Sequence, residues 1–600
     1  MFFGAYLGLS DRDSEWISVM RRHAAWLGLA AHIETRVLRD GWTFAFGWMT
    51  PTAADPTAYF HETGQYLYLT TGAGLGDARQ ADGPEHQWER RLACVDTNTI
   101  YLRLALDSRR MTVVVPVATP EQFYFARDGQ GCAFTNDLRL LIHWRGLDLD
   151  ERAVYALFQN GRIPPPLTIC ASMSRVPGGH TLEIAPDPFE PVFQRHFHLP
   201  SRASEKHDPA VAEAAVQETL DSVLASVPAP AALYFSGGVD SGLVAARLAK
   251  LGRTDVTLVN YSFGPDDDRS SLAMQIASHL GMPYERVTYD PAGLAHVLAR
   301  LGKDYSYPFG GRSAIPTNLM VHESTGGRGS PAAIIEGTGA DGAFGLGPRR
   351  RIWERVYRIP TALRRLVGAC HQRLGGWKYD STFLKLQRIG DVALGSVQMP
   401  LQHLAVMSQN CLDGIAYTIP PVVRRELRGT IRTYTEVLGS DLDSVDAFCL
   451  LDIVSVCAGE FAAKCFDPLR RKGVTAVFPF LEPPMIRTAF SLGWNEKCPK
   501  GEPKGLLKQM LGRAIPREWV YLPKGYFIPP FRRWLRHPSN REFLHDVVLS
   551  PANPLLAFCD DRVTCRMVDR AERGLGYDTG TQKFLWTLMF TSGWLSQLKF

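Results

Sequence analysis

The chain has 600 residues, of which 45% are hydrophobic and 21% are charged. These proportions are typical of folded globular proteins, so they exclude a wholly disordered chain. The 66 Lys and Arg residues nearly balance the 61 Asp and Glu residues, and a net charge of +5 is too dilute to indicate nucleic-acid binding by itself. A chain of this length forms about two to four domains.

The simple counts also predict a cytoplasmic protein. Its 11 Cys residues include no Cys-x-x-Cys pair and no zinc-type spacing, which indicates reduced thiols. The apolar start 1–10 lacks a basic region and is followed by Asp11 and Asp13, so it is predicted to be a buried strand rather than a signal peptide. No apolar run is long enough for a membrane span, and none is expected.

Residues 1 to about 200 have the pattern of a β-rich domain that two helices interrupt. The expected strands include 65–71, 111–118 and 121–126, and the expected helices are 14–30 and 149–160. Polar residues 201–209 follow, and we expect a domain boundary at this point, with a second domain over 201–600.

From about residue 210 the pattern changes to short apolar strands that alternate with helices. The expected elements are helix 209–226, strand 231–235, helix 241–251, strand 255–263, helix 268–281, strand 284–289 and strand 332–336. Such alternation predicts an α/β fold with a doubly wound parallel sheet. Residues 346–460 are mostly helical in pattern and form an insert in this domain.

A glycine-rich loop lies between the first of these strands and the next helix. Two glycines let the backbone approach a ligand closely, and the helix N-terminus beyond them suits phosphate. A carboxylate in such a loop indicates an intervening Mg²⁺. An ordinary turn is the alternative interpretation, but a strand, SGGxDS and a helix match the pyrophosphate loop of ATP pyrophosphatases, which form acyl-adenylates. The loop residues are Ser236, Gly237, Gly238, Val239, Asp240 and Ser241.

A second acidic turn, EGTGADGAFG at 336–345, follows strand 332–336. Parallel strands present their carboxyl ends at one edge of the sheet, so Asp341 is expected to face Asp240 across a ligand crevice. Two carboxylates on one Mg²⁺ would stabilise departing pyrophosphate. We therefore predict ATP and Mg²⁺ as cofactors, with Asp240 and Asp341 as the metal ligands.

With these motifs the sequence resembles the asparagine synthetase family. The resemblance implies an N-terminal glutaminase-like (Ntn-type) αββα sandwich, followed by a parallel-sheet ATP-pyrophosphatase domain with the helical insert. It covers most of the chain, and residues 346–450 and the last 50 are the least constrained by it. The similar segments are SGGVDS, EGTGADGAFG, 474–490, 504–524, 129–141 and 161–183.

The same resemblance implies further site residues. Lys524 corresponds to the lysine that contacts phosphate and stabilises charge in the transition state. Lys504 and Lys508 are alternative phosphate contacts, although solvated side chains are the more ordinary interpretation of both. The remaining nucleotide contacts that the resemblance implies are Val259, Ser262, Phe263 and Gly339.

Two departures from the family pattern bear on function. Glutamine-dependent members need a Cys directly after Met1, and this chain has Phe2, so we expect no glutaminase activity. Thr338 stands where asparagine synthetases have Glu, and a threonine cannot act as a general base at neutral pH. Glu460 is the candidate carboxylate for that task, and a structural ion pair, for example with Lys464, is the alternative.

Members that lack the cysteine include the β-lactam synthetases and the macrolactam synthetases of lasso peptides. The size and the GTGADG turn favour the second group, which joins an Asp or Glu side chain of a precursor peptide to its N-terminal amine. The expected partners are that precursor, a leader peptidase and a leader-recognition protein. The basic stretch 349–388 would guide an acidic peptide, or else forms solvated helix faces. Cyclisation of a β-amino acid, a scaffold without catalysis and ammonia-dependent asparagine formation are the alternatives.

Overall fold

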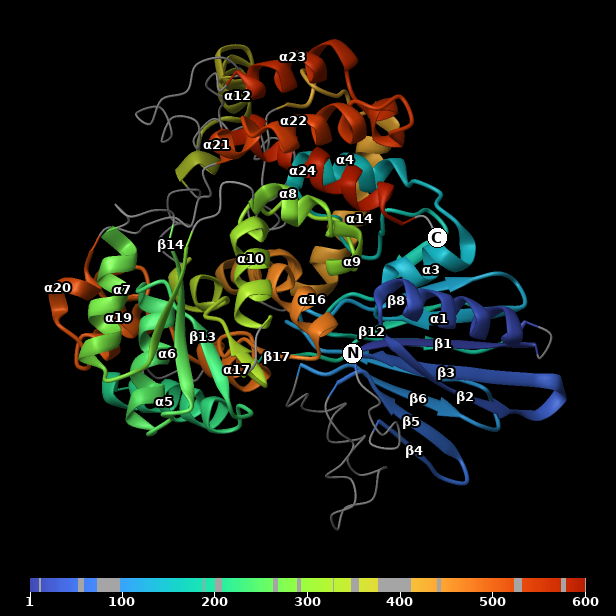
Figure 1. The fold of residues 1–600 in the computed structure, drawn as a ribbon, viewed down its shortest axis with the longest axis horizontal. Helices are drawn as coiled ribbons and strands as arrows, with labels where there is room; N and C mark the ends of the chain where they lie inside the picture. The colour runs from blue at the N-terminus through green and yellow to red at the C-terminus, as the bar shows by residue number, and fades with distance from the viewer. Residues whose placement is uncertain are drawn as a thin grey trace.

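The computed structural model consists of an N-terminal sandwich of two sheets and a second domain around a parallel sheet (Figure 1). No helix in the described part of the chain is long and apolar enough to cross a bilayer. The described residues are 1–9, 12–51, 59–72, 98–186, 189–199, 208–262, 268–288, 293–326, 329–346, 355–375, 412–439, 444–522, 531–573 and 579–598.

Each sheet of the sandwich has six strands, and every neighbouring pair is antiparallel. In spatial order the first sheet has β10 (Met173–Arg175), β8 (Tyr124–Arg127), β9 (Gly131–Thr135), β1 (Phe2–Leu9), β3 (Trp42–Thr50) and β2 (Ala30–Val37). The second sheet has β12 (Val192–Arg195), β11 (His180–Ile184), β7 (Met111–Val115), β6 (Tyr101–Ala105), β5 (Tyr66–Thr70) and β4 (Phe60–Glu62).

Strand β1 shows how the sandwich forms. Because side chains alternate along a strand, Phe3 and Leu7 point into the core between the two sheets, whereas Phe2 and Tyr6 point to the outer face. On that outer face lie α1 (Asp13–Leu27) and α3 (Leu138–Arg145). The prediction that the apolar N-terminus is a buried strand is confirmed.

The second domain is built on five strands that are all parallel. In spatial order these are β15 (Tyr284–Thr288), β14 (Val256–Ser262), β13 (Ala231–Tyr234), β16 (Ala333–Ile335) and β17 (Thr475–Val477). Chain order reverses between β13 and β16, and in sheets of this kind ligands bind in the crevice outside the carboxyl ends of the strands at that point. The predicted doubly wound α/β sheet is confirmed.

Helices cover both faces of this sheet (Figure 1). One side carries α5 (Pro209–Ala225), α6 (Val239–Lys250) and α7 (Asp268–His279), and the other carries α10 (Ala314–Ser324) and α16 (Ala463–Lys472). Helix α6 follows β13 directly, so its N-terminus lies at the crevice. Only a short loop joins the strand to the helix, and this is the arrangement of a phosphate-binding loop.

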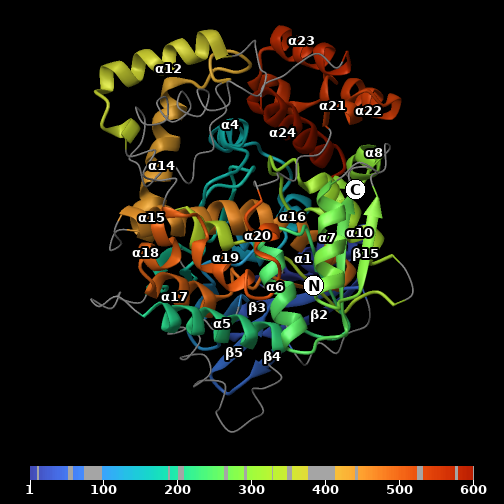
Figure 2. The same cartoon turned by 90° about the vertical axis from the view of Figure 1, so that its left-hand side faces the viewer.

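Within 346–460 the described residues are mainly helical, and the basic stretch 349–388 is described only over 355–375. The elements there are α12 (Thr361–Gly375), α14 (Pro421–Gly439), α15 (Ser444–Asp452) and the π-helix η7 (Ile453–Ala462). Figure 2 shows α12 and the C-terminal helices at the end of the molecule opposite β4 and β5. Those C-terminal helices are α21 (Phe531–Leu535), α22 (Pro538–Phe543), α23 (Asp561–Glu572) and α24 (Thr579–Ser596).

The remaining helices connect these layers. They are η1 (Arg39–Gly41), α4 (Glu151–Asn160), α8 (Gly293–Leu298), α9 (Leu301–Asp304), η4 (Asp341–Gly345), α17 (Pro483–Ser491), α18 (Trp494–Lys497), η8 (Pro499–Gly501), α19 (Gly505–Leu511), α20 (Arg517–Val520), η9 (Leu544–Val548) and η10 (Pro554–Phe558). One buried cluster continues from the outer face of β1 through to β13 and α24, so the two domains share a core.

Candidate active site

The loop after β13 has the geometry of a phosphate cradle. Gly237 has a φ of +68°, and a Cβ atom there would lie 3.2 Å from the Cα of Ala273 in α7. Gly238 caps α6 with no side-chain acceptor, which leaves the first N–H groups of the helix available to a ligand. The hydroxyl oxygens of Ser236 and Ser241 lie 3.2 Å apart and fix the loop from both ends.

The second acidic turn touches this loop directly. A Cβ atom on Gly337 would lie 3.3 Å from the Cβ of Asp240, so the two turns are in contact across the crevice. Gly339 has a φ of +111°, and a Cβ there would lie 2.7 Å from Leu481. This tight packing holds η4, whose first residue is Asp341.

The two acidic residues converge on one lysine. The Nζ of Lys504 lies 2.8 and 2.6 Å from the carboxylate oxygens of Asp240, and 3.0 Å from Oδ1 of Asp341. The Lys504 side chain is only 9% exposed, so the interpretation of this lysine as a solvated side chain was wrong. Lys508 is instead bound to Glu502 at 2.7 Å.

The electrostatics of this cluster suit a cation between the two carboxylates. Burial lowers the pKa of the Lys504 ammonium, but the charges of Asp240 and Asp341 raise it by more, so it lies above the ordinary lysine value. No group of three or more potential metal ligands exists among the described residues. Mg²⁺ needs only one or two carboxylates when phosphate oxygens and water complete its shell, so this donor set fits the predicted ion.

Strand β14 ends beside the phosphate loop. The N–H of Phe235 donates to the carbonyl of Val259 at 2.8 Å, and Asn260 Nδ2 donates to the carbonyl of Phe235 at 2.7 Å. Ser262 is the buried last residue of β14, and Phe263 lies outside the described residues. Val259 and Ser262 are therefore held at the crevice edge. The role of Asn260 in this arrangement was not predicted, because a single asparagine within a strand carries no motif.

Glu460 is buried in η7 and accepts a 2.6 Å hydrogen bond from Arg162 of the N-terminal domain. Within the part of the chain that the structure describes, no hydrogen bond or ion pair joins Glu460 to Thr338 or to Lys464. The ion-pair alternative to a catalytic role therefore involves Arg162, a partner that the sequence did not indicate. Lys524, the other predicted catalytic residue, lies outside the described residues.

An aromatic ring fills the position where a glutaminase nucleophile would stand. Phe2 is fully buried, and the guanidinium of Arg470 lies 4.0 Å from its ring centroid. The Met1 ammonium donates to the carbonyl of Arg470 at 3.3 Å, and burial together with the Arg470 charge lowers its pKa to about 5. The side chain at this position is thus a packing element with no nucleophilic atom.

Comparison with known families agrees with the phosphate loop and the parallel sheet. A family model described as asparagine synthase matches residues 213–596. The chain belongs to the asparagine synthase family. The family uses ATP with Mg²⁺, which fits the carboxylate pair at the crevice.

One curated relative and two solved structures are similar to parts of the chain. Asparagine synthetase [glutamine-hydrolyzing] 1 of Bacillus subtilis (strain 168) is 22% identical over 454 residues, which are 71% of this chain and 65% of that protein. The match thus spans less than two thirds of the length of that relative.

The solved structures are more distant. Glutamine phosphoribosylpyrophosphate amidotransferase from B. subtilis is 9% identical, with 48% of this chain and 65% of that chain covered and a TM-score of 0.22. The NH3-dependent NAD synthetase from Campylobacter jejuni subsp. jejuni is 11% identical, with 39% of this chain and 97% of that chain covered and a TM-score of 0.19.

Proposed function

We propose that this protein is an ATP- and Mg²⁺-dependent amide synthetase that activates a carboxylate as its adenylate and joins it to an amine. The observation that carries the proposal is the convergence of Asp240 and Asp341 on one cation at the point where strand order reverses. The glycine-rich loop on the same crevice presents helix N–H groups for phosphate.

In the first step, a substrate carboxylate oxygen bonds to the α-phosphorus of ATP, and pyrophosphate leaves. Asp240 and Asp341 would hold Mg²⁺, which neutralises charge on the departing pyrophosphate. The loop around Ser236 and Gly238 would bind the phosphate oxygens, and Lys504 would add a positive charge once it is released from the carboxylates. Lys524 is proposed as a second source of positive charge.

In the second step, an amine attacks the acyl carbon, AMP leaves, and the amine gives up a proton. We propose Glu460 as the acceptor of that proton, either directly or through water. The hydrogen bond from Arg162 holds the Glu460 carboxylate in a fixed orientation. Thr338 lies on the crevice turn and would position the substrate rather than take the proton.

For the substrate we propose a precursor peptide that carries both reacting groups. Phe2 supports this choice, because without a nucleophile at position 2 the amine nitrogen must come from a source other than glutamine. The amine would be the new N-terminus of the peptide, and the carboxylate an Asp or Glu side chain. A leader peptidase and a leader-recognition protein would supply the trimmed peptide.

The proposal is tested by incubating the protein with ATP, Mg²⁺, a candidate precursor and its peptidase, followed by mass spectrometry. The expected product is one water molecule lighter than the trimmed peptide and is absent with Asp240→Asn. Pyrophosphate release with a β-amino acid alone would indicate that the substrate is a small β-amino acid that the enzyme cyclises, and not a peptide. Asparagine formed from aspartate and ammonium would overturn ring closure, and ATP binding without pyrophosphate exchange would overturn catalysis altogether.

A further inference from the structure

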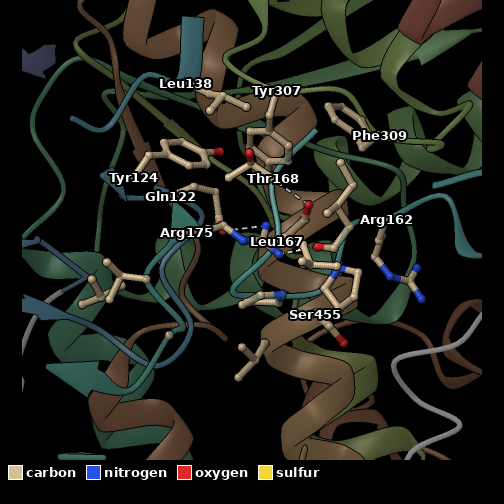
Figure 3. Close-up of a pocket in the computed structure, with 18 of the residues that line it drawn as sticks. Gln122, Tyr124, Leu138, Arg162, Leu167, Thr168, Arg175, Tyr307, Phe309 and Ser455 are labelled. Atoms are coloured by element: carbon tan, nitrogen blue, oxygen red, sulfur yellow. Dashed lines mark hydrogen bonds between the residues drawn. The ribbon is translucent and has the colours of Figure 1, made fainter. Parts of the chain in front are cut away.

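A cavity lies between the two domains, apart from the nucleotide crevice (Figure 3). Its walls come from strands of the N-terminal domain, from the segment after α4, and from η7 of the second domain. The interior open to solvent molecules is about 50 Å³, several times the space that one water molecule needs. A space of this size admits a small molecule.

The cavity contains a buried cation that has no carboxylate partner. Arg175 is 8% exposed; its Nη1 donates to Gln122 Oε1 at 3.1 Å, and its Nη2 donates to the carbonyl of Ile163. Its Nε is buried and has no acceptor among the described residues. The other charged groups in the wall are paired, Arg162 with Glu460 and Glu121 with Arg470 at 3.7 Å. One positive charge in the cavity is therefore left unneutralised.

Two tyrosine hydroxyls in the same wall also lack partners. The Oη atoms of Tyr124 and Tyr434 are buried without a hydrogen-bond partner in the described structure. Burial raises the pKa of both hydroxyls and the charge of Arg175 acts in the opposite direction, so both are neutral donors near the guanidinium. Figure 3 shows the Tyr124 and Tyr307 hydroxyls turned toward the same space, and Tyr307 already donates to the carbonyl of Gly459 at 2.9 Å.

We infer that this cavity is a binding site for a small aliphatic carboxylate. A buried cation without a counter-charge and buried hydroxyls without partners are unfavourable, and a carboxylate in the cavity would supply the missing negative charge and hydrogen-bond acceptors. The Nε of Arg175 and the Tyr124 and Tyr434 hydroxyls would donate to its two oxygens. The apolar part of the wall, which includes Leu167 and Phe309, would accommodate a short hydrocarbon tail.

The position of η7 separates this site from the nucleotide crevice. Val454, Ser455 and Gly459 line the cavity. From the same helix, Ile453 and Cys457 lie against Gly342, directly after Asp341, because a Cβ there would be 2.6 and 3.5 Å from their side chains. The carboxylate site thus lies across η7 from the metal ligands, and its occupation does not depend on the proposed reaction.

Propionate is the probe for this site. Saturation-transfer NMR on the full chain measures its dissociation constant, with sodium chloride holding the ionic strength constant. We expect saturable binding to the wild type and at least a tenfold weaker affinity for Arg175→Gln. Tyr124→Phe combined with Tyr434→Phe should weaken binding severalfold. Arg513→Gln, which removes a 69% exposed arginine, is the matched control and should bind as the wild type does.

A second variant tests the site independently in case Arg175→Gln does not fold. Ser455→Leu places apolar volume in the cavity while Arg175 stays in place, and we expect it to abolish propionate binding without loss of ATP binding. Absence of saturable binding to the wild type would overturn the site. Equal affinity in the wild type, Arg175→Gln and Ser455→Leu would likewise place propionate elsewhere on the protein.

Discussion

At the scale of single residues, the proposed function depends on the convergence of Asp240 and Asp341 on Lys504. Replacing either by Asn removes a negative charge but keeps the shape. We expect Asp240→Asn and Asp341→Asn each to lower ATP–pyrophosphate exchange by at least about 100-fold, because metal-held charge on the leaving group is worth several kcal/mol. Glu502→Gln, at the neighbouring ion pair with Lys508, is the control and should change exchange little. Normal exchange in either Asp variant would contradict the paired-carboxylate site.

A second residue-scale prediction concerns Glu482. Burial raises its pKa to about 7, and a hydrogen bond from Asn98 acts in the opposite direction. Because the folded pKa lies above the unfolded value, the stabilising contribution is present below about pH 4.5 and is lost as the pH rises through about 7. Glu482→Gln lacks this loss, so its free energy of unfolding should exceed that of the wild type by roughly 1–3 kcal/mol at pH 8.

Urea unfolding of Glu482→Gln at pH 4.5 and pH 8 measures this difference. The two proteins should have nearly equal stability at the lower pH. Glu518→Gln, at an exposed position of α20, should follow the wild type at both values. A Glu482→Gln variant with the same pH dependence as the wild type would show that Glu482 is ionised in the folded protein without penalty.

At the scale of elements, the helices and strands with a clear local periodicity were predicted close to their observed bounds. Helix 209–226 and strand 255–263 correspond to Pro209–Ala225 and Val256–Ser262, because amphipathic spacing and β-branched runs are local signals. Strand β17 was not predicted, because its sequence Thr-Ala-Val lacks the longer apolar run that indicated the equally short strand β16. The π-helix η7 was not predicted either, because an apolar helical pattern does not distinguish a π-helix from an α-helix.

The contact between η4 and η7 gives a prediction about Gly342. A Cβ atom at this position would lie 2.6 Å from Cγ1 of Ile453, so Gly342→Ala forces η7 away from the turn that carries Asp341. We expect a loss of about 1–3 kcal/mol in the free energy of unfolding. Gly429→Ala is the control, because a Cβ there meets nothing and the residue lies within α14; it should gain up to about 1 kcal/mol. Equal effects of the two substitutions, measured by urea unfolding, would contradict the close packing of η4 on η7.

At the scale of the whole molecule, part of the site follows from topology and part does not. The facing of Asp240 and Asp341 follows from parallel strands that end at one edge. The pairs Lys504–Asp240 and Arg162–Glu460 join residues 264 and 298 positions apart. No pattern in the sequence specifies such pairs, because the first depends on how the start of α19 packs against α6 and the second on how the two domains pack. The second pair crosses the domain interface, as does the contact of Phe2 with Arg470.

The shared core leads to a prediction about how the molecule unfolds. Phe2 is fully buried beneath Arg470, in a cluster that continues into the second domain. Phe2→Ala leaves a cavity at the interface, which should lower stability by about 3–5 kcal/mol. Because both domains lose packing together, calorimetry should record a lower Tm with a single transition. Phe193→Ala, at a ring that is 36% exposed on β12, should shift Tm far less. A second transition in Phe2→Ala, with one domain unfolding at the wild-type temperature, would mean that the interface does not couple the domains.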